Sequence, residues 1–385
     1  MPETMTPYER MRAAWSCEVP DRVPVMPMTL YVVAHHGGIS IKEFITQPEK
    51  YMQAALDSLD IIGDMQHPGV NAANHMAMLG RCGWDMTTLD WRLWDEFPPK
   101  GNLPSLYEKV LLDYDDVMER GFSTILFSTA LENGIHERSV EDFLYYQFEH
   151  VKAIRAQWEK FYETTGIPIL MGARAEHPLD MLQSYRGINQ LVMDMYTMPD
   201  KLLEFMYWLA DYEVMQASQE AVAMGAGELP GAETIFFYNG APPGLPPDLY
   251  DKLYIPVGKR MIDAWVERGF NIWCHYDNDQ TPHLESLKTY ADGIPKGHVL
   301  LDFEKTDMKK AKEVMQGTMC ICGNVPSMLL VYGTPEEVDA YCKKLIEDCA
   351  PGGGYVLGVE CETPWDAKPE NVIAMKQAAV KYGMY

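Results

Sequence analysis

The stretch NIWCHYDNDQTPHLESLKTYADGIPKGHVLLDF, residues 271–303, contains two short apolar runs separated by a longer, more polar segment. We interpret residues 271–276 and 299–303 as β-strands, because both runs are short and rich in aliphatic and aromatic residues. Similar runs recur toward the carboxyl end at a spacing of roughly 20 to 35 residues, with amphipathic segments between them. This alternation predicts parallel strands with helices packed outside them.

The same pattern extends through the rest of the chain. Candidate strands are predicted at residues 23–28, 58–63, 123–127, 167–172, 234–238, 271–276, 299–303, 319–322 and 355–359. Amphipathic helices are predicted at residues 202–223, 249–267, 308–315 and 335–349. About eight real strands favour an α/β fold of the (β/α)8 TIM-barrel type. A Rossmann fold is disfavoured, because no G-x-G-x-x-G fingerprint follows the first strand.

Residues 70–160 differ from this pattern, because they are rich in Trp, Tyr and acidic residues and show few strand signals. We expect a largely helical excursion that covers the mouth of the barrel. The chain shows no linker, low-complexity tract or internal repeat. We therefore predict a single domain over residues 1–385 with a mostly helical insertion.

The charge balance argues against a nucleic-acid partner. The chain has 32 Lys and Arg residues against 56 Asp and Glu residues, and its formal net charge is −24. Such a surface repels phosphate unless it carries a strong basic stripe, and the sequence contains none. We expect no nucleic-acid partner.

Targeting signals and cysteine usage predict a cytoplasmic protein. The amino-terminal segment has no apolar run after its charged residues, and no stretch approaches the ~20 apolar residues of a membrane-spanning helix. The eight cysteines are scattered, which indicates reduced thiols. We expect no membrane partner, and the sequence leaves open whether the protein is a homo-oligomer.

A histidine and a carboxylate follow each other at the end of the predicted strand 271–276. Alternate residues of a strand share a face, so His275 and Asp277 should point the same way. In parallel barrels the carboxyl ends of the strands converge on the active site. The pair is therefore a candidate half-site for zinc, and the alternative is a hydrogen-bonded histidine beside a turn of acidic residues.

Cys361 follows the predicted strand 355–359 and is flanked by two glutamates. These acids would raise the pKa of its thiol and make it a poor nucleophile unless a cation offset their charge. Alone, the cysteine could be structural. With His275 and Asp277 it would supply three ligands and leave a fourth position open, which is the catalytic arrangement for zinc.

Other strand ends provide further candidates. Tyr238 and Asn239 close one strand and could bind a substrate, and Glu304 closes another, where a salt bridge is the alternative. Cys322 is a reserve metal ligand at the end of strand 319–322. His35 and His36 follow the first strand and are candidate substrate-binding residues.

The chain resembles the uroporphyrinogen decarboxylase superfamily and, within it, the corrinoid-dependent methyltransferase branch. The likeness covers nearly the whole chain and is densest after residue 230. The motifs that carry it are Glu9-Arg10, Asp21-Arg22-Val23-Pro24-Val25, Gly323-Asn324-Val325-Pro326, Gly333-Thr334-Pro335-Glu336-Glu337-Val338, Gly352-Gly353-Gly354-Tyr355-Val356-Leu357, Cys361-Glu362-Thr363-Pro364 and Pro369-Glu370-Asn371-Val372. As a set they are specific to the superfamily, and much less specific to one reaction.

The resemblance implies a (β/α)8 barrel and a zinc site. In the methyltransferases a His-x-Cys pair and a later Cys bind the metal, and these positions correspond to His275, Asp277 and Cys361. Asp277 thus replaces a family cysteine, which makes the site harder and better matched to an oxygen ligand. The decarboxylases have an arginine-rich segment after the first strand, whereas residues 26–38 here contain no arginine.

The resemblance and the site together predict a zinc-dependent methyltransferase, an O-demethylase component. It would move a methyl group from a methyl ether, aromatic by our hypothesis, to the cob(I)alamin of a separate corrinoid protein. Glu304 or Tyr238 would orient the substrate or supply a proton. The alternatives are methylation of coenzyme M or tetrahydrofolate from methylcobalamin, a decarboxylase-like activity, and a non-catalytic partner of a corrinoid protein.

Overall fold

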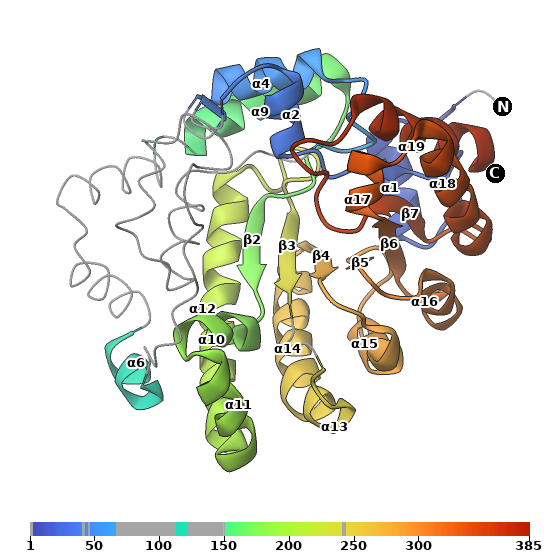
Figure 1. Cartoon of the computed structure of the whole chain (residues 1–385). Coiled ribbons are helices and arrows are strands. Elements are labelled where there is room, and N and C mark those ends of the chain that lie inside the picture. The colour runs from blue at the N-terminus through green and yellow to red at the C-terminus, as the bar shows by residue number, and fades with distance from the viewer. Residues whose placement is uncertain are drawn as a thin grey trace.

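The computed structural model describes residues 3–40, 43–44, 47–66, 113–121, 149, 151–240 and 244–385. Within these ranges seven strands form one parallel sheet (Figure 1). The strands are β1 (Val25–Met26), β2 (Ala173–Glu176), β3 (Thr234–Asn239), β4 (Asn271–Tyr276), β5 (Val299–Phe303), β6 (Cys320–Val325) and β7 (Tyr355–Val359). Their order across the sheet is β1-β7-β6-β5-β4-β3-β2.

Residues 61–66 connect the two ends of this strand order. The amide of Asp64 donates to the carbonyl of Val25 in β1, at 2.8 Å. The amide of Gln66 donates to the carbonyl of Pro168 at 3.0 Å, and Gln66 forms a parallel bridge with Ile169 shortly before β2. The parallel strands and the helices around them confirm the predicted α/β barrel fold.

Helices follow most strands of the described part of the chain. The α-helices are α1 (Pro7–Trp15), α2 (Tyr31–His36), α4 (Pro48–Asp57), α6 (Tyr114–Arg120), α9 (Val151–Thr165), α10 (Pro178–Tyr185), α11 (Ile188–Thr197), α12 (Pro199–Ala223), α13 (Pro247–Leu249), α14 (Ile255–Val266), α15 (Leu284–Lys288), α16 (Met308–Met315), α17 (Ser327–Tyr332), α18 (Pro335–Cys349) and α19 (Pro369–Tyr382). A π-helix, η3 (Tyr250–Tyr254), joins α13 to α14, and short 3-10 turns η4 (Thr281–His283) and η5 (Thr289–Ala291) flank α15.

Local sequence explains where the carboxy-terminal helices begin. Thr334 caps α18 by accepting the amide of Glu337, whose carboxylate accepts the amide of Thr334 in return. This capping box satisfies two amides that a helix start leaves without partners. Asp307 caps α16 in the same way, because its side chain accepts the amide of Lys310. The predicted bounds of both helices are confirmed.

The strand register places one row of chemically active side chains on a single face of the sheet. Glu176 pairs with Tyr238, Tyr238 with His275, His275 with Asp302, and Asp302 with Cys322. Residues paired across parallel strands point to the same face. The row therefore crosses five neighbouring strands near their carboxyl ends.

The structure corrects two predicted strands. Residues 58–62 form a turn after α4, in which the amides of Ile61 and Ile62 donate to the carbonyl of Ser58, and their side chains are buried. The strand expected at residues 167–172 lies later, at β2, where alternating Arg174 and Glu176 concealed it from an apolar pattern. The strand predicted at residues 123–127 lies outside the described residues.

The predicted helical insertion at residues 70–160 lies mostly outside the described residues. Within that range, α6 and the beginning of α9 are helical. The two chain ends lie close together (Figure 1), with Arg22 bridged to Met384 and the amide of Tyr385 donating to the carbonyl of Asp21. Among the described helices, none combines the length and apolar character that a membrane crossing requires.

Candidate metal centre

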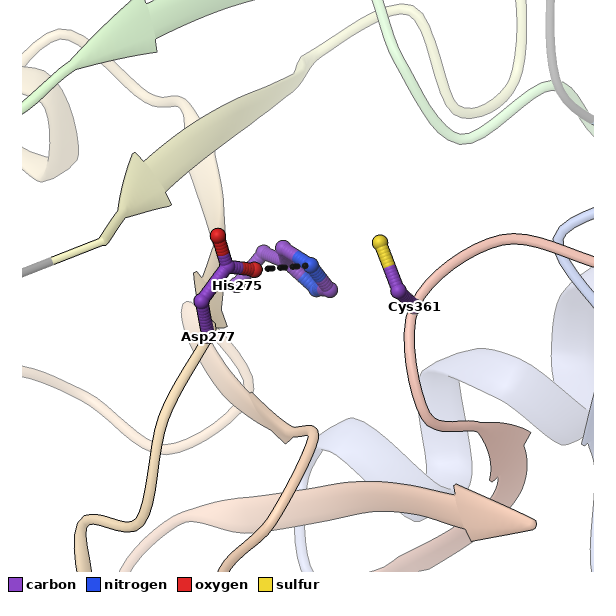
Figure 2. A group of neighbouring side chains, drawn as sticks. All are labelled: His275, Asp277 and Cys361. Carbon is purple, nitrogen blue, oxygen red and sulfur yellow. Dashed lines mark ion pairs between the residues drawn. The ribbon is translucent and has the colours of Figure 1, made fainter. Parts of the chain in front are cut away.

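Three ligand-type side chains converge at the carboxyl ends of two strands. His275 is the fifth residue of β4, Asp277 follows that strand directly, and Cys361 lies two residues beyond β7. One imidazole nitrogen, one carboxylate oxygen and the thiol sulfur all lie within 4.8 Å of one another. Figure 2 shows His275 and Asp277 side by side, with the sulfur of Cys361 facing the imidazole ring from a separate loop.

The imidazole of His275 is enclosed and held from one side. It is 1% exposed, and its Nδ1 lies 2.8 Å from Oδ2 of Asp302. Because a carboxylate accepts at Nδ1, that nitrogen carries a proton. Nε2 is buried and lies 3.2 Å from Oδ1 of Asp277, with which it forms an ion pair when the ring is protonated. A metal at this position would replace the proton on Nε2, and a buried ring nitrogen beside a carboxylate is the environment of a metal ligand.

Asp302 is a candidate functional residue that the sequence analysis did not identify. It lies in the middle of the apolar strand β5 and is 1% exposed. Its Oδ2 accepts from both His275 Nδ1 and the indole nitrogen of Trp273, the latter at 2.9 Å. A carboxylate behind a metal-binding histidine fixes the ring and raises its basicity. The signal in the sequence was an acid within the otherwise apolar run VLLDF.

Asp277 has its two carboxylate oxygens divided between two neighbours. Oδ1 faces His275, and Oδ2 accepts the phenol of Tyr238 at 2.6 Å. Burial raises the pKa of Asp277, but its contacts with His275 and Tyr238 outweigh burial and hold the pKa below its usual value. The guanidinium of Arg174 lies 5.3 Å from the centre of the Tyr238 ring and acts in the same direction on Asp277. Asp277 is therefore poised as an anion.

Cys361 is placed by a loop tied to the start of the barrel. The amide of Thr363 donates to the carbonyl of Met28 at 3.2 Å, and its hydroxyl donates to the carbonyl of Pro27. The thiol of Cys361 is half-buried. Beside it, burial raises the pKa of Glu362 to about 7.

Glu304 also lies at this rim. It follows β5, is half-buried, and its amide donates to the carbonyl of Tyr276 at 3.0 Å. Burial, followed by the charge of Asp277, raises the pKa of its carboxyl above the ordinary value. A carboxyl with a raised pKa can hold a proton for donation to a leaving group. Cys322 lies buried in the row beside Asp302, and the group of three converging ligands does not include it.

The remaining predicted site residues lie around this centre. Asn239 is fully buried, and its amide group bonds to the carbonyl of Phe237 and to the phenol of Tyr254. His36 is half-buried at the end of α2 and pairs with Asp60 at 3.4 Å. His35 is exposed, and its ring meets that of Trp365, four residues after Cys361, edge to face at 4.9 Å. Their roles in binding stay predictions.

The donor set fits a divalent metal with one open position. Zinc accepts imidazole nitrogen, carboxylate oxygen and thiolate sulfur, and its catalytic sites have three protein ligands. The buried Nε2 of His275, which faces Asp277, and the support from Asp302 agree with this requirement. The structure therefore brings together the three residues that the sequence predicted as ligands.

Comparisons with known proteins agree with the fold. The family model described as uroporphyrinogen decarboxylase (URO-D) matches residues 133–382. A methyltransferase from Methanosarcina mazei has a similar structure, with a TM-score of 0.66, 18% identity, and coverage of 98% of this chain and 99% of that chain. A B12-independent methionine synthase from Shewanella sp. W3-18-1, in complex with selenomethionine, has a TM-score of 0.38 at 11% identity over 59% of this chain and 65% of that chain. No curated protein matches the sequence.

Proposed function

This chain belongs to the uroporphyrinogen decarboxylase family, and we propose that it is a zinc-dependent methyltransferase. Its reaction would transfer a methyl group from a methyl ether, with an aryl ether as the preferred class, to cobalt(I) of a corrinoid carried by a separate protein. The single observation that supports this most is the convergence of His275, Asp277 and Cys361 within 4.8 Å. The likeness to a methyltransferase fold is consistent with the proposal.

In the proposed reaction the step that needs catalysis is the departure of the ether oxygen with its electron pair. Cobalt(I) attacks the methyl carbon, the C–O bond breaks, and the oxygen keeps the electron pair and takes up a proton. Zinc held by His275, Asp277 and Cys361 would act as a Lewis acid toward that developing anion. One carboxylate and one thiolate make this donor set harder than one with two thiolates, which favours an oxygen ligand.

The protein's own groups would position the substrate and manage the proton. Glu304 is half-buried at the rim and its raised pKa suits a proton donor to the departing oxygen. Tyr238 donates to Asp277 and fixes the orientation of that carboxylate. The aromatic rings of Phe236 and Tyr238 both stack near His275, with centroids at 5.5 and 6.4 Å, and form an apolar wall beside the site.

The experiment is a methyl-transfer assay with a panel of methoxybenzenes and a reduced corrinoid protein. We expect the absorption spectrum of cob(I)alamin to convert to that of methylcobalamin with at least one aryl methyl ether. Cys342→Ala, which alters a buried thiol on α18, is the control and should retain the activity. No conversion across the panel, together with turnover of methylcobalamin and coenzyme M, would reverse the proposed direction of transfer.

A further inference from the structure

A buried hydrogen-bond network lies behind the strand end that carries Tyr238. Asp180, at the start of α10, is 3% exposed. Its Oδ2 accepts the amide of Gly240 at 3.0 Å and lies 3.2 Å from the phenol of Tyr254. The same phenol lies 3.0 Å from Oδ1 of Asn239. The network thus runs from Asp180 through Tyr254 to Asn239.

Residues 238–240 are held between this hydrogen-bond network and the proposed metal ligand Asp277. On one side, Tyr238 donates its phenol to Asp277, and the amide of Asp277 donates to the carbonyl of Asn239 at 3.3 Å. On the other side, Asp180 and Tyr254 contact Asn239 and Gly240. The segment 238–240 therefore contacts the proposed metal site through Tyr238 and the buried network through Asn239 and Gly240.

The position of Tyr254 is fixed independently of its hydroxyl group. It is the last residue of the π-helix η3, and its ring stacks on His177 at 3.8 Å and on Tyr250 at 4.8 Å. Its carbonyl contacts Nε2 of His177 at 3.1 Å. Single π-helical turns often occur at functional sites. Replacing the phenol by a phenyl ring would therefore remove the two hydrogen bonds of the hydroxyl group, to Asp180 and Asn239, and leave the stack in place.

Counting the protons in this network indicates the protonation state of Asp180. Tyr254 has one hydroxyl proton, and Oδ1 of Asn239 can only accept. If Asp180 were ionised, one of the two contacts of Tyr254 would contain no proton. If Asp180 carries a proton on Oδ2, it donates to Tyr254, and Tyr254 donates to Asn239. The other oxygen of Asp180 then accepts from Gln183 at 3.1 Å, and every contact has one donor.

The charges around Asp180 favour the same state. Burial raises the pKa of its carboxyl well above the ordinary range, and the charge of Glu176 adds to this effect. The carboxyls and phenols that face Asp180 become negative when they lose a proton, and they are Glu176, Tyr238, Tyr250, Tyr254, Asp277 and Tyr290. His177, whose ring stacks on Tyr254, is neutral near pH 7, because burial lowers its pKa to about 3. None of these neighbours offers the positive charge that an ionised Asp180 would require.

We propose that Asp180 is a neutral carboxylic acid which, with Tyr254, forms a positioning unit for residues 238–240 and, through Tyr238, for the carboxylate of Asp277. The inference rests on the metal site proposed above and does not depend on the methyl-transfer reaction. Neither residue touches the reacting atoms, so both act through others.

The test compares Tyr254→Phe with Tyr114→Phe in the full-length protein. Tyr114 is a matched control, because its buried phenol donates at 2.7 Å to a buried carboxylate, Asp194, in a separate network. Both variants should lower the melting temperature. Only Tyr254→Phe should weaken the binding of zinc and cobalt(II), by about tenfold, and alter the visible spectrum of bound cobalt(II). A Tyr254→Phe protein with unchanged metal affinity and spectrum would reduce Tyr254 to a structural role and overturn the proposal.

Asp180→Asn tests the protonation state. The amide is neutral, but it can keep only one of the two contacts of Oδ2, with Gly240 or with Tyr254, so metal affinity should fall by no more than in Tyr254→Phe. Infrared spectra of the wild type should contain the C=O stretch of a protonated carboxyl group that Asp180→Asn lacks. Absence of that band would show an ionised Asp180 and contradict the proposal. A negative methyl-transfer assay would leave both measurements unchanged.

Discussion

His275 and Asp302 are paired across β4 and β5, and Nδ1 of the histidine lies 2.8 Å from Oδ2 of the aspartate. The contact is buried, since both side chains are 2% exposed. It fixes the ring so that Nε2 faces Asp277 and Cys361. The geometry of the centre therefore depends on a residue that is not one of its ligands.

Asp302→Asn should weaken zinc binding by about 10- to 100-fold, because the histidine loses a charged acceptor that orients it and raises its basicity. Competition with a chelator of known affinity measures this change. Asp194→Asn is the control, since Asp194 is also buried and paired, with Arg186 and Tyr114. Equal zinc affinity in Asp302→Asn and wild type would show that Asp302 has no part in metal binding.

Purified wild-type protein should contain about one zinc ion per chain, as expected of a three-residue catalytic site. His275→Ala and Cys361→Ala should each lower zinc occupancy strongly, because each removes one of three converging donors. Elemental analysis after dialysis measures the content, with Cys342→Ala as the control for loss of a thiol. Full zinc retention in both ligand variants would refute the site.

Asp277→Cys should retain the metal but lower the rate of ether cleavage. A second thiolate donates more electron density and makes zinc a weaker Lewis acid. The substitution also removes the acceptor of the Tyr238 phenol, and Tyr238→Phe alone shows how much of the effect comes from that loss. An Asp277→Cys enzyme that cleaves aryl ethers as fast as wild type would show that hardness of the site is irrelevant.

Stability should fall in acid through Asp21, near the amino terminus. Burial raises the pKa of Asp21, but hydrogen bonds from Arg10 and from the amides of Met5 and Thr4 hold it well below its usual range. A carboxylate with a depressed pKa stabilises the fold above its unfolded pKa of about 4, and that contribution is lost as pH decreases toward the folded value.

Asp21→Asn should therefore lower the free energy of unfolding by on the order of 2 kcal/mol at pH 7 and reduce its dependence on pH below about 4. Urea unfolding at a series of pH values measures both effects. Asp248→Asn, at an exposed position, should change neither. Parallel pH profiles for Asp21→Asn and wild type would exclude Asp21 as the source of acid sensitivity.

Much of the carboxy-terminal half could be predicted because its strands are continuous apolar runs. β4, β5 and β7 have the predicted bounds, as do α16 and α18. Strands buried on both faces are typical of parallel sheets, and their composition is distinctive. The convergence of the three candidate ligands could be predicted for the same reason, since each lies at or just beyond such a strand end.

Other features were harder to predict for physical reasons. β2 has Arg174 and Glu176 on one face, so its polar alternation does not resemble a buried parallel strand. Asp302 was missed because its role arises only from pairing with His275 on another strand. Asp180 and Tyr254 are 74 residues apart in the chain, and no spacing rule connects them.

The ligands of the centre come from β4 and from the loop after β7, and that loop is tied to Pro27 and Met28 beside β1. A partly folded chain in which these distant segments have not met would lack the complete donor set. Metal should therefore bind late in folding and select the finished barrel over its precursors. At a free zinc concentration of about 1,000 times the dissociation constant, this selection would add about 4 kcal/mol to the free energy of unfolding. Starvation for zinc would then affect the lifetime of the newly made protein as well as its chemistry.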